Sequence, residues 1–166
     1  MLVYHPSFDI YHTAYRILKI LYDNRNIEIE KDRMRIIDFI LLFPQELNNF
    51  RVPQNASKFK NLYKITTYNK IPDKNRVFQQ TRSFYEISLQ CLTSRDLLDL
   101  DQYKQGILKL NLTSIDDGLK TELSRTDLID QTILKIIYDH FIKLPTKDLI
   151  ERTSLVDNKY AIYKNQ

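Results

Sequence analysis

The chain has 166 residues, 43% of them hydrophobic, and a formal net charge of +4. The hydrophobic fraction excludes a disordered tail, and the length leaves room for one ordinary core or two very small ones. With two glycines and one cysteine in the whole chain, nucleotide-binding loops, folds with many hairpins and disulfide frameworks are disfavoured. Because the N-terminus lacks the features of a signal peptide and the longest apolar run, FILLF, is too short for a membrane span, we expect a cytoplasmic protein without membrane contact.

The first part of the chain predicts two helices separated by a short extended piece. Residues 9–23 carry apolar side chains, Tyr11 among them, at helical spacing, with Asp9 in the N-cap position. Isoleucine and glutamate then alternate over 27–30. A second helix over 31–43 is apolar on nearly every side, so it should be buried, and Pro44 should end it or restart the next turn.

The second part of the chain begins with a weak pattern over 45–75, which is compatible with short helices. A strong pattern over 74–93 predicts a helix with Cys91 on its buried apolar face, and the alternating stretch ILKLNL predicts one strand or a two-stranded wing. Residues 126–144 predict a long helix closed by Pro145, and a short helix follows before a polar tail.

The order of these elements predicts a mainly α fold with a small β element. A finer interpretation is a winged-helix-like unit over 1–112, followed by a C-terminal helical extension over 113–166 that packs on it, so that both form one compact domain. Periodicity alone supports only the coarser description.

The histidines give little support for a metal site or for catalysis. His5 precedes Pro6 and lies seven residues before His12, so the two cannot form the i, i+4 pair of a helical metal site. His140 has no second histidine or cysteine within a turn. The chain has no nucleophile motif, and its acidic pairs lie in turns, where such residues commonly cap helices. We therefore expect a protein that is not an enzyme and that binds no metal or cofactor.

Polar residues stand among apolar neighbours in both N-terminal helices: Tyr11, His12 and Arg16 in the first, Arg35 and Asp38 in the second. A buried charge must be paired. Arg35 and Asp38 could pair with each other at i, i+3 spacing, or one of them could reach the polar side of the first helix. These five residues are interpreted as a structural polar lock, and a docking surface for a partner would use the same side chains.

Charge is distributed unevenly along the chain. Residues 51–82 contain eight basic residues and one acid, with tyrosines interleaved, whereas acids predominate over 96–130. A basic stretch with aromatic residues can contact nucleic acid, an acidic partner protein would use the same side chains, and a solvated loop is the third interpretation. The basic residues are Arg51, Lys58, Lys60, Lys64, Lys70, Lys74, Arg76 and Arg82.

Two motifs in the N-terminal helices resemble a known family. From Tyr11 to Leu18 the chain reads Tyr-His-x-Ala-x-Arg-aliphatic-Leu, and from Arg35 to Pro44 it reads Arg-x-x-Asp-Phe-x-x-x-Phe-Pro. With the long helix, acidic turn and strand predicted over 76–112, they resemble the middle component of bacterial ABC-three-component conflict systems, such as the Lamassu-type anti-phage and anti-plasmid systems. Thr13 stands where this family commonly has cysteine, which speaks against a metal ligand at His12.

The resemblance implies a non-catalytic accessory subunit. Its partners would be an SMC-like or Rad50-like ABC ATPase and an effector, often a nuclease, and the assembled complex could contact double-stranded DNA. The alternative is a stand-alone winged-helix transcription regulator, in which Lys74, Arg76 and Arg82 at the start of the helix over 74–93 would enter the major groove.

Overall fold

The computed structural model describes residues 9–156. The longer helices are α1 (Ile10–Asp23), α2 (Lys31–Leu42), α4 (Arg82–Ser94) and α7 (Gln131–His140); shorter ones are α3 (Lys74–Gln80), α5 (Leu100–Lys104), α6 (Asp117–Ser124) and α8 (Thr146–Thr153). Short 3-10 helices are η2 (Pro44–Asn48), η3 (Gln54–Phe59) and η4 (Leu112–Ser114), and the strands are β1 (Ile29–Glu30) and β2 (Ile107–Leu108). The predicted mainly α fold with a small β element is confirmed.

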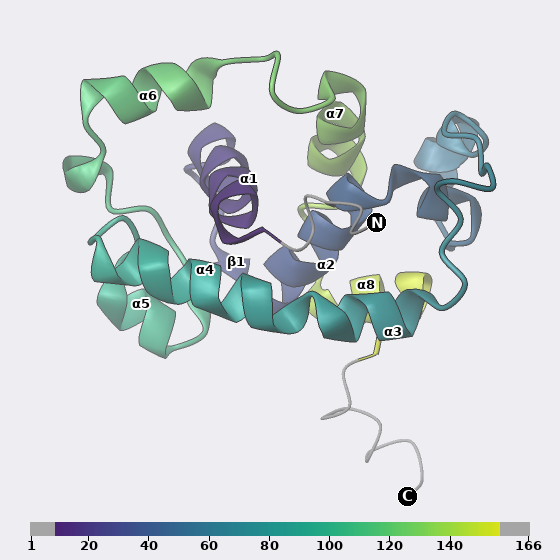
Figure 1. Cartoon of the computed structure of the whole chain (residues 1–166), viewed down its shortest axis with the longest axis horizontal. Helices are drawn as coiled ribbons and strands as arrows, with labels where there is room; N and C mark the ends of the chain where they lie inside the picture. Colours follow the sequence, from purple (N-terminus) through teal and green to yellow (C-terminus); the bar gives the residue numbers. More distant parts are fainter. Residues whose placement is uncertain (1–8, 157–166) are drawn as a thin grey trace, which may run out of the picture.

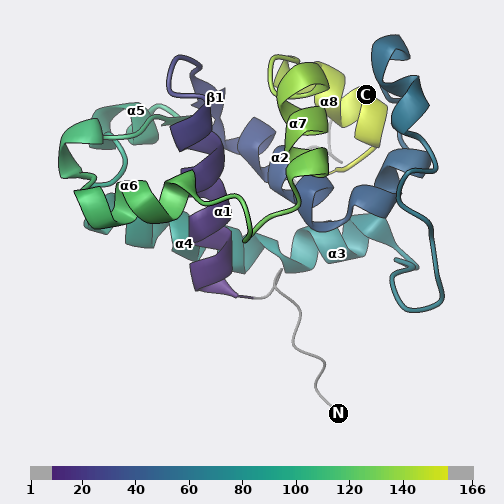
Figure 2. The same cartoon turned by 90° about the horizontal axis from the view of Figure 1, so that it is seen from above.

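The helices form an elongated body whose two ends are built differently. Helices α3 and α4 run one after the other along its length; α1 packs against α4, and α2 lies between α1, α7 and α8 (Figure 1). Helices α5 and α6 form one end, while the segment over 44–73 forms the other, as both views show (Figure 2). The segments that are richest in acids and in bases are thus separated along the long axis.

The small sheet joins the two parts of the chain that the sequence predicted to be extended. Strands β1 and β2 are antiparallel, with Ile29 opposite Leu108, and an isolated bridge joins Leu98 to Leu110. The strand predicted in ILKLNL therefore pairs with the piece that precedes α2. The winged-helix arrangement and the division into 1–112 and 113–166 remain predictions.

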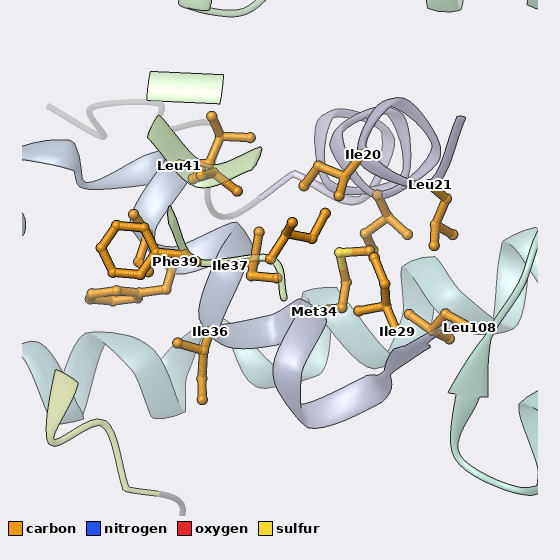
Figure 3. Packing of buried hydrophobic residues seen from close by; sticks show 14 of the residues in the cluster. Ile20, Leu21, Ile29, Met34, Ile36, Ile37, Phe39, Leu41 and Leu108 are labelled. Atoms are coloured by element: carbon orange, nitrogen blue, oxygen red, sulfur yellow. The ribbon is translucent and has the colours of Figure 1, made fainter. Parts of the chain in front are cut away.

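One hydrophobic cluster runs through the whole body and has α2 at its centre. Eight consecutive residues of this helix, from Met34 to Leu41, are buried, as its all-round apolar pattern predicted. Met34 lies beside Ile29 of β1 and faces Ile20 of α1 (Figure 3). Burial of each large aliphatic side chain contributes about 1.5–3 kcal/mol, so this cluster is the main source of stability.

The helix predicted over 74–93 is in fact two helices, because it is interrupted at Thr81. At this junction the carbonyl oxygen of Phe78 accepts hydrogen bonds from Thr81 Oγ1 at 2.9 Å and from Arg35 Nη2 at 2.6 Å. Side-chain donors of this kind compete with the regular backbone ladder and bend or break helices.

Three further sequence predictions are wrong in detail. The helix predicted over 126–144 is limited to α7, because the Asp130 side chain caps it by accepting from the backbone N–H of Thr132; Leu128, predicted on its apolar face, lies before it and is exposed. Cys91 is exposed rather than buried, and it lines an open cavity between α1, α4 and α6. Tyr11, assigned to the apolar face of α1, is 83% exposed.

Candidate functional site

A buried ion pair joins the first two helices. Arg16 Nε lies 2.6 Å from Asp38 Oδ1 and Arg16 Nη2 lies 3.2 Å from Asp38 Oδ2, so the guanidinium binds the carboxylate with two hydrogen bonds. Arg16 Nη2 also donates to Thr13 Oγ1 at 3.0 Å. Bidentate pairs of this kind fix the relative orientation of the two side chains, and this pair therefore fixes α1 against α2.

Arg35 extends the polar network from α2 to the junction of α3 and α4. Its guanidinium lies 4.0 Å from the centroid of the Phe78 ring, in addition to the hydrogen bond to the Phe78 carbonyl. The Phe78 ring in turn meets Phe39 edge-on, with the centroids 5.5 Å apart. Of the two arrangements that the sequence left open for Asp38, the one that reaches the first helix is the one that forms.

Lys19 forms buried polar contacts that were not predicted from the sequence. Its Nζ atom donates to the Leu123 carbonyl at 2.7 Å and to Asp23 Oδ1 at 3.1 Å, and so it joins α1 to the C-terminal end of α6. The i, i+4 spacing of Lys19 and Asp23 is a signal in the sequence for the ion pair. The contact with Leu123, more than a hundred residues away, has no such signal.

Tyr11 and His12 are exposed in the first turn of α1. A cavity of about 410 Å³ lies on one side, between α1, α4 and α6, and has Ala14, Cys91 and Leu119 in its lining. A second cavity, of about 530 Å³, lies between α1, the end of α2 and the loop over 128–130. Tyr11 lines both cavities, so the first turn of α1 forms a ridge between them.

Potential metal-ligating side chains do not form a cluster in the described part of the chain. Over residues 9–156, no group of three or more His, Cys, Asp or Glu side chains is arranged to hold a metal ion. His140 packs on the Phe59 ring, with the centroids 5.5 Å apart. His5 lies outside the described residues.

Residues 54–72, called the basic segment from here on, are held in shape by amide side chains. Gln45 Nε2 donates to the Asn69 carbonyl at 2.8 Å, and Asn48 Nδ2 donates to the Tyr63 carbonyl at 2.9 Å. Asn48 Oδ1 also accepts from the backbone N–H of Asn61 at 2.6 Å. These bonds anchor the segment to η2 and satisfy part of its backbone without regular secondary structure.

Tyr63 anchors the basic segment to the start of α7. Its hydroxyl donates to Asp130 Oδ2 at 2.7 Å. Desolvation and this bond together raise the pKa of Tyr63 well above its ordinary value. Partial burial pushes the pKa of Asp130 upward, but the bonds from Tyr63 and from the Thr132 amide outweigh it, so the net pKa lies below its ordinary value.

The predicted basic residues do not form a single cluster. Lys74 is partly buried and lies over the Phe50 ring, 5.1 Å from its centroid, while Arg51 lies beside α8, where its backbone N–H donates to the Arg152 carbonyl. Arg82 is partly buried at the start of α4, and Arg76 is exposed on α3. The remaining four are exposed on the basic segment: Lys58, Lys60, Lys64 and Lys70.

At the opposite end, over residues 96–127, most of the acidic side chains are engaged locally. Asp99 caps α5 by accepting from two backbone N–H groups, and Asp116 caps α6 by accepting from one. Asp117 pairs with Lys120 at 2.9 Å, and Arg125 bonds to both Glu122 and Asp127. The capping role that the sequence suggested for the acids in turns is therefore observed at Asp99 and Asp116.

A known protein family matches almost the whole chain. A family model described as "ABC-three component (ABC-3C) system Middle Component 5" matches residues 2–161. No match was found among curated proteins or among solved structures. Within residues 9–156, no helix combines the length and the hydrophobicity that crossing a membrane requires. The chain therefore belongs to the Middle Component 5 family of ABC-three component systems, and this membership implies an accessory subunit of such a defence system.

Proposed function

We propose that this protein is a non-catalytic, cytoplasmic subunit that links an SMC-like or Rad50-like ABC ATPase to an effector nuclease, in a system of the Lamassu type directed against phages and plasmids. The observation that carries the proposal is the family match, which covers residues 2–161 and so accounts for almost the whole chain as one middle component. The assembled complex, rather than this chain alone, would contact double-stranded DNA.

A linking role requires two separate surfaces, and two features of the structure support it. The first is the ridge at Tyr11 and His12 on α1, flanked by its two cavities. The second is the basic segment at the far end of α3 from α4. We propose that each contacts a different component, while Arg16, Asp38 and Arg35 hold the intervening helices in fixed orientation.

The alternative function, a stand-alone winged-helix regulator, is less well supported. The two helices of a DNA-binding helix-turn-helix unit are normally joined by a turn of about three or four residues. Here the whole segment over 43–73 lies between α2 and α3. In addition, Lys74 and Arg82, which such a regulator would present to the major groove, are partly buried.

Co-expression with the other two components of the system tests the proposal. We expect purification through an affinity tag on this chain to recover both components, and we expect omission of the chain to separate the ATPase from the effector. Recovery of neither component would contradict the proposal. A footprint on a specific DNA duplex with the purified chain alone would favour the regulator instead.

A further inference from the structure

The basic segment combines positive charge with exposed apolar side chains. It contains four lysines and no acidic residue. Leu62 is 51% exposed, Ile65 is 44% exposed and Tyr68 is fully exposed. No lysine of the segment forms an ion pair with a described residue. The charges and the apolar side chains are thus both available to a partner.

The shape of this surface is set before any partner binds. The bonds from Gln45 and Asn48 anchor the segment from one side, and the bond from Tyr63 to Asp130 anchors it from another. Within the segment, Asn69 accepts from the backbone N–H of Thr66 and donates to the Lys64 carbonyl. Ordering of flexible loops is a main cost of association, and here much of that cost is met by folding.

The combination of lysines with exposed apolar side chains favours a protein over DNA as the partner of this segment. Contacts with the phosphate backbone need only cations and polar donors, and exposed Leu62 and Ile65 would gain little there. Protein interfaces, in contrast, bury aliphatic and aromatic side chains at their centre and surround them with charges. A partner with carboxylates and apolar residues would complement the lysines and would also cover Leu62, Ile65 and Tyr68.

From this complementarity we infer that the basic segment is the docking site for an acidic, amphipathic segment of another protein component of the system, and not a DNA-binding loop. This inference rests on the proposed function and assigns one surface to it. The acids of the chain itself over 96–127 are a weaker match, because those of α6 and its caps are already engaged in caps and local ion pairs.

The test is affinity capture of the other two components by variants of the full chain. One variant removes the apolar group (Leu62→Ser, Ile65→Ser and Tyr68→Ser), and the other removes the charges (Lys58→Ala, Lys60→Ala, Lys64→Ala and Lys70→Ala). Matched controls at the opposite end are Leu112→Ser, whose side chain is 50% exposed, and the exposed pair Lys104→Ala and Lys109→Ala. We expect each segment variant to reduce capture of one component about tenfold or more, and the controls to stay near the wild type.

Three results would overturn the inference while leaving the proposed function intact. These are undiminished capture by both segment variants, equal losses in the controls, and a loss of duplex DNA binding in mobility shifts without loss of capture. Dissociation of a homodimer by the same variants, seen by sedimentation, would assign the surface to a second copy instead. Failure of the wild-type chain to capture either component would contradict the proposed function itself. Circular dichroism and the thermal midpoint of each variant establish that it is folded.

Discussion

Charged residues serve opposite purposes at the interface of α1 with α2 and in the basic segment. Arg16 and Asp38 are buried and bound to each other across two helices, so their chemistry is directed inward. The lysines of the basic segment are exposed and lie beside equally exposed apolar residues. The number of charges in a stretch therefore does not indicate their role; the partner that each charge meets does.

The greatest loss of stability is expected when the buried pair of Arg16 and Asp38 is broken. Asp38→Ala leaves the Arg16 guanidinium buried without its carboxylate, and should lower the free energy of unfolding by about 3–5 kcal/mol. Urea denaturation measures this loss. The double variant Arg16→Met/Asp38→Leu should recover most of it, because apolar residues of similar volume can replace a buried pair. Asp117→Ala, which breaks the exposed pair with Lys120, should leave the midpoint unchanged.

A smaller loss is expected where the basic segment is anchored. Asn48→Ala removes the bonds to Tyr63 and Asn61 and should cost about 1–2 kcal/mol, since each net hydrogen bond contributes about 1 kcal/mol. Limited proteolysis should also become faster within 54–72. Asn55→Ala is the control, because the Asn55 side chain is exposed and has no hydrogen bond within the described residues. Equal proteolysis of both variants would show that Asn48 does not shape the segment.

The bond between Tyr63 and Asp130 predicts a dependence on pH. Because folding lowers the pKa of Asp130, its contribution to stability is complete above the unfolded value of about 3.9 and is lost as the pH falls through the lower folded value. The difference in unfolding free energy between the wild type and Asp130→Asn should be constant between about pH 5 and 7 and should shrink below about pH 4. A difference that grows on acidification would contradict this assignment.

The smallest effect on stability is expected from the lysines of the basic segment. Replacing Lys58, Lys60, Lys64 and Lys70 by alanine should change the free energy of unfolding by no more than about 0.5 kcal/mol per site, as for other exposed positions without special contacts. Thermal denaturation is a sufficient measurement. A large loss would mean that these lysines stabilise the fold, and the contrast with Arg16 and Asp38 would then disappear.

Local signals allowed much of the fold to be predicted, and contacts between distant residues account for what was missed. The N-cap at Asp9 and the burial of α2 follow from spacing within a few residues. At the interruption at Thr81, Arg35 reaches the Phe78 carbonyl from another helix, and no local pattern reports that contact.

In the candidate site, too, local signals were predictive and contacts between distant residues were not. That Asp38 needs a partner could be inferred from its apolar surroundings, and the choice of Arg16 depends on how the helices pack. The positive charge of residues 51–82 was evident in the sequence. The sequence did not show that Lys64 is exposed while Lys74 is partly buried, or that the aliphatic Leu62 is exposed as well. These exposures depend on how the bonds from Gln45 and Asn48 hold the segment.

Hydrogen–deuterium exchange on the wild-type chain, free and in complex with the other two components, measures directly whether the basic segment is covered in the complex. We expect binding to slow exchange of backbone amides over 60–70, while amides over 99–114, which line neither cavity beside α1, exchange as in the free chain. Slower exchange confined to 99–114, with residues 60–70 unchanged in the complex, would contradict the assignment of the basic segment.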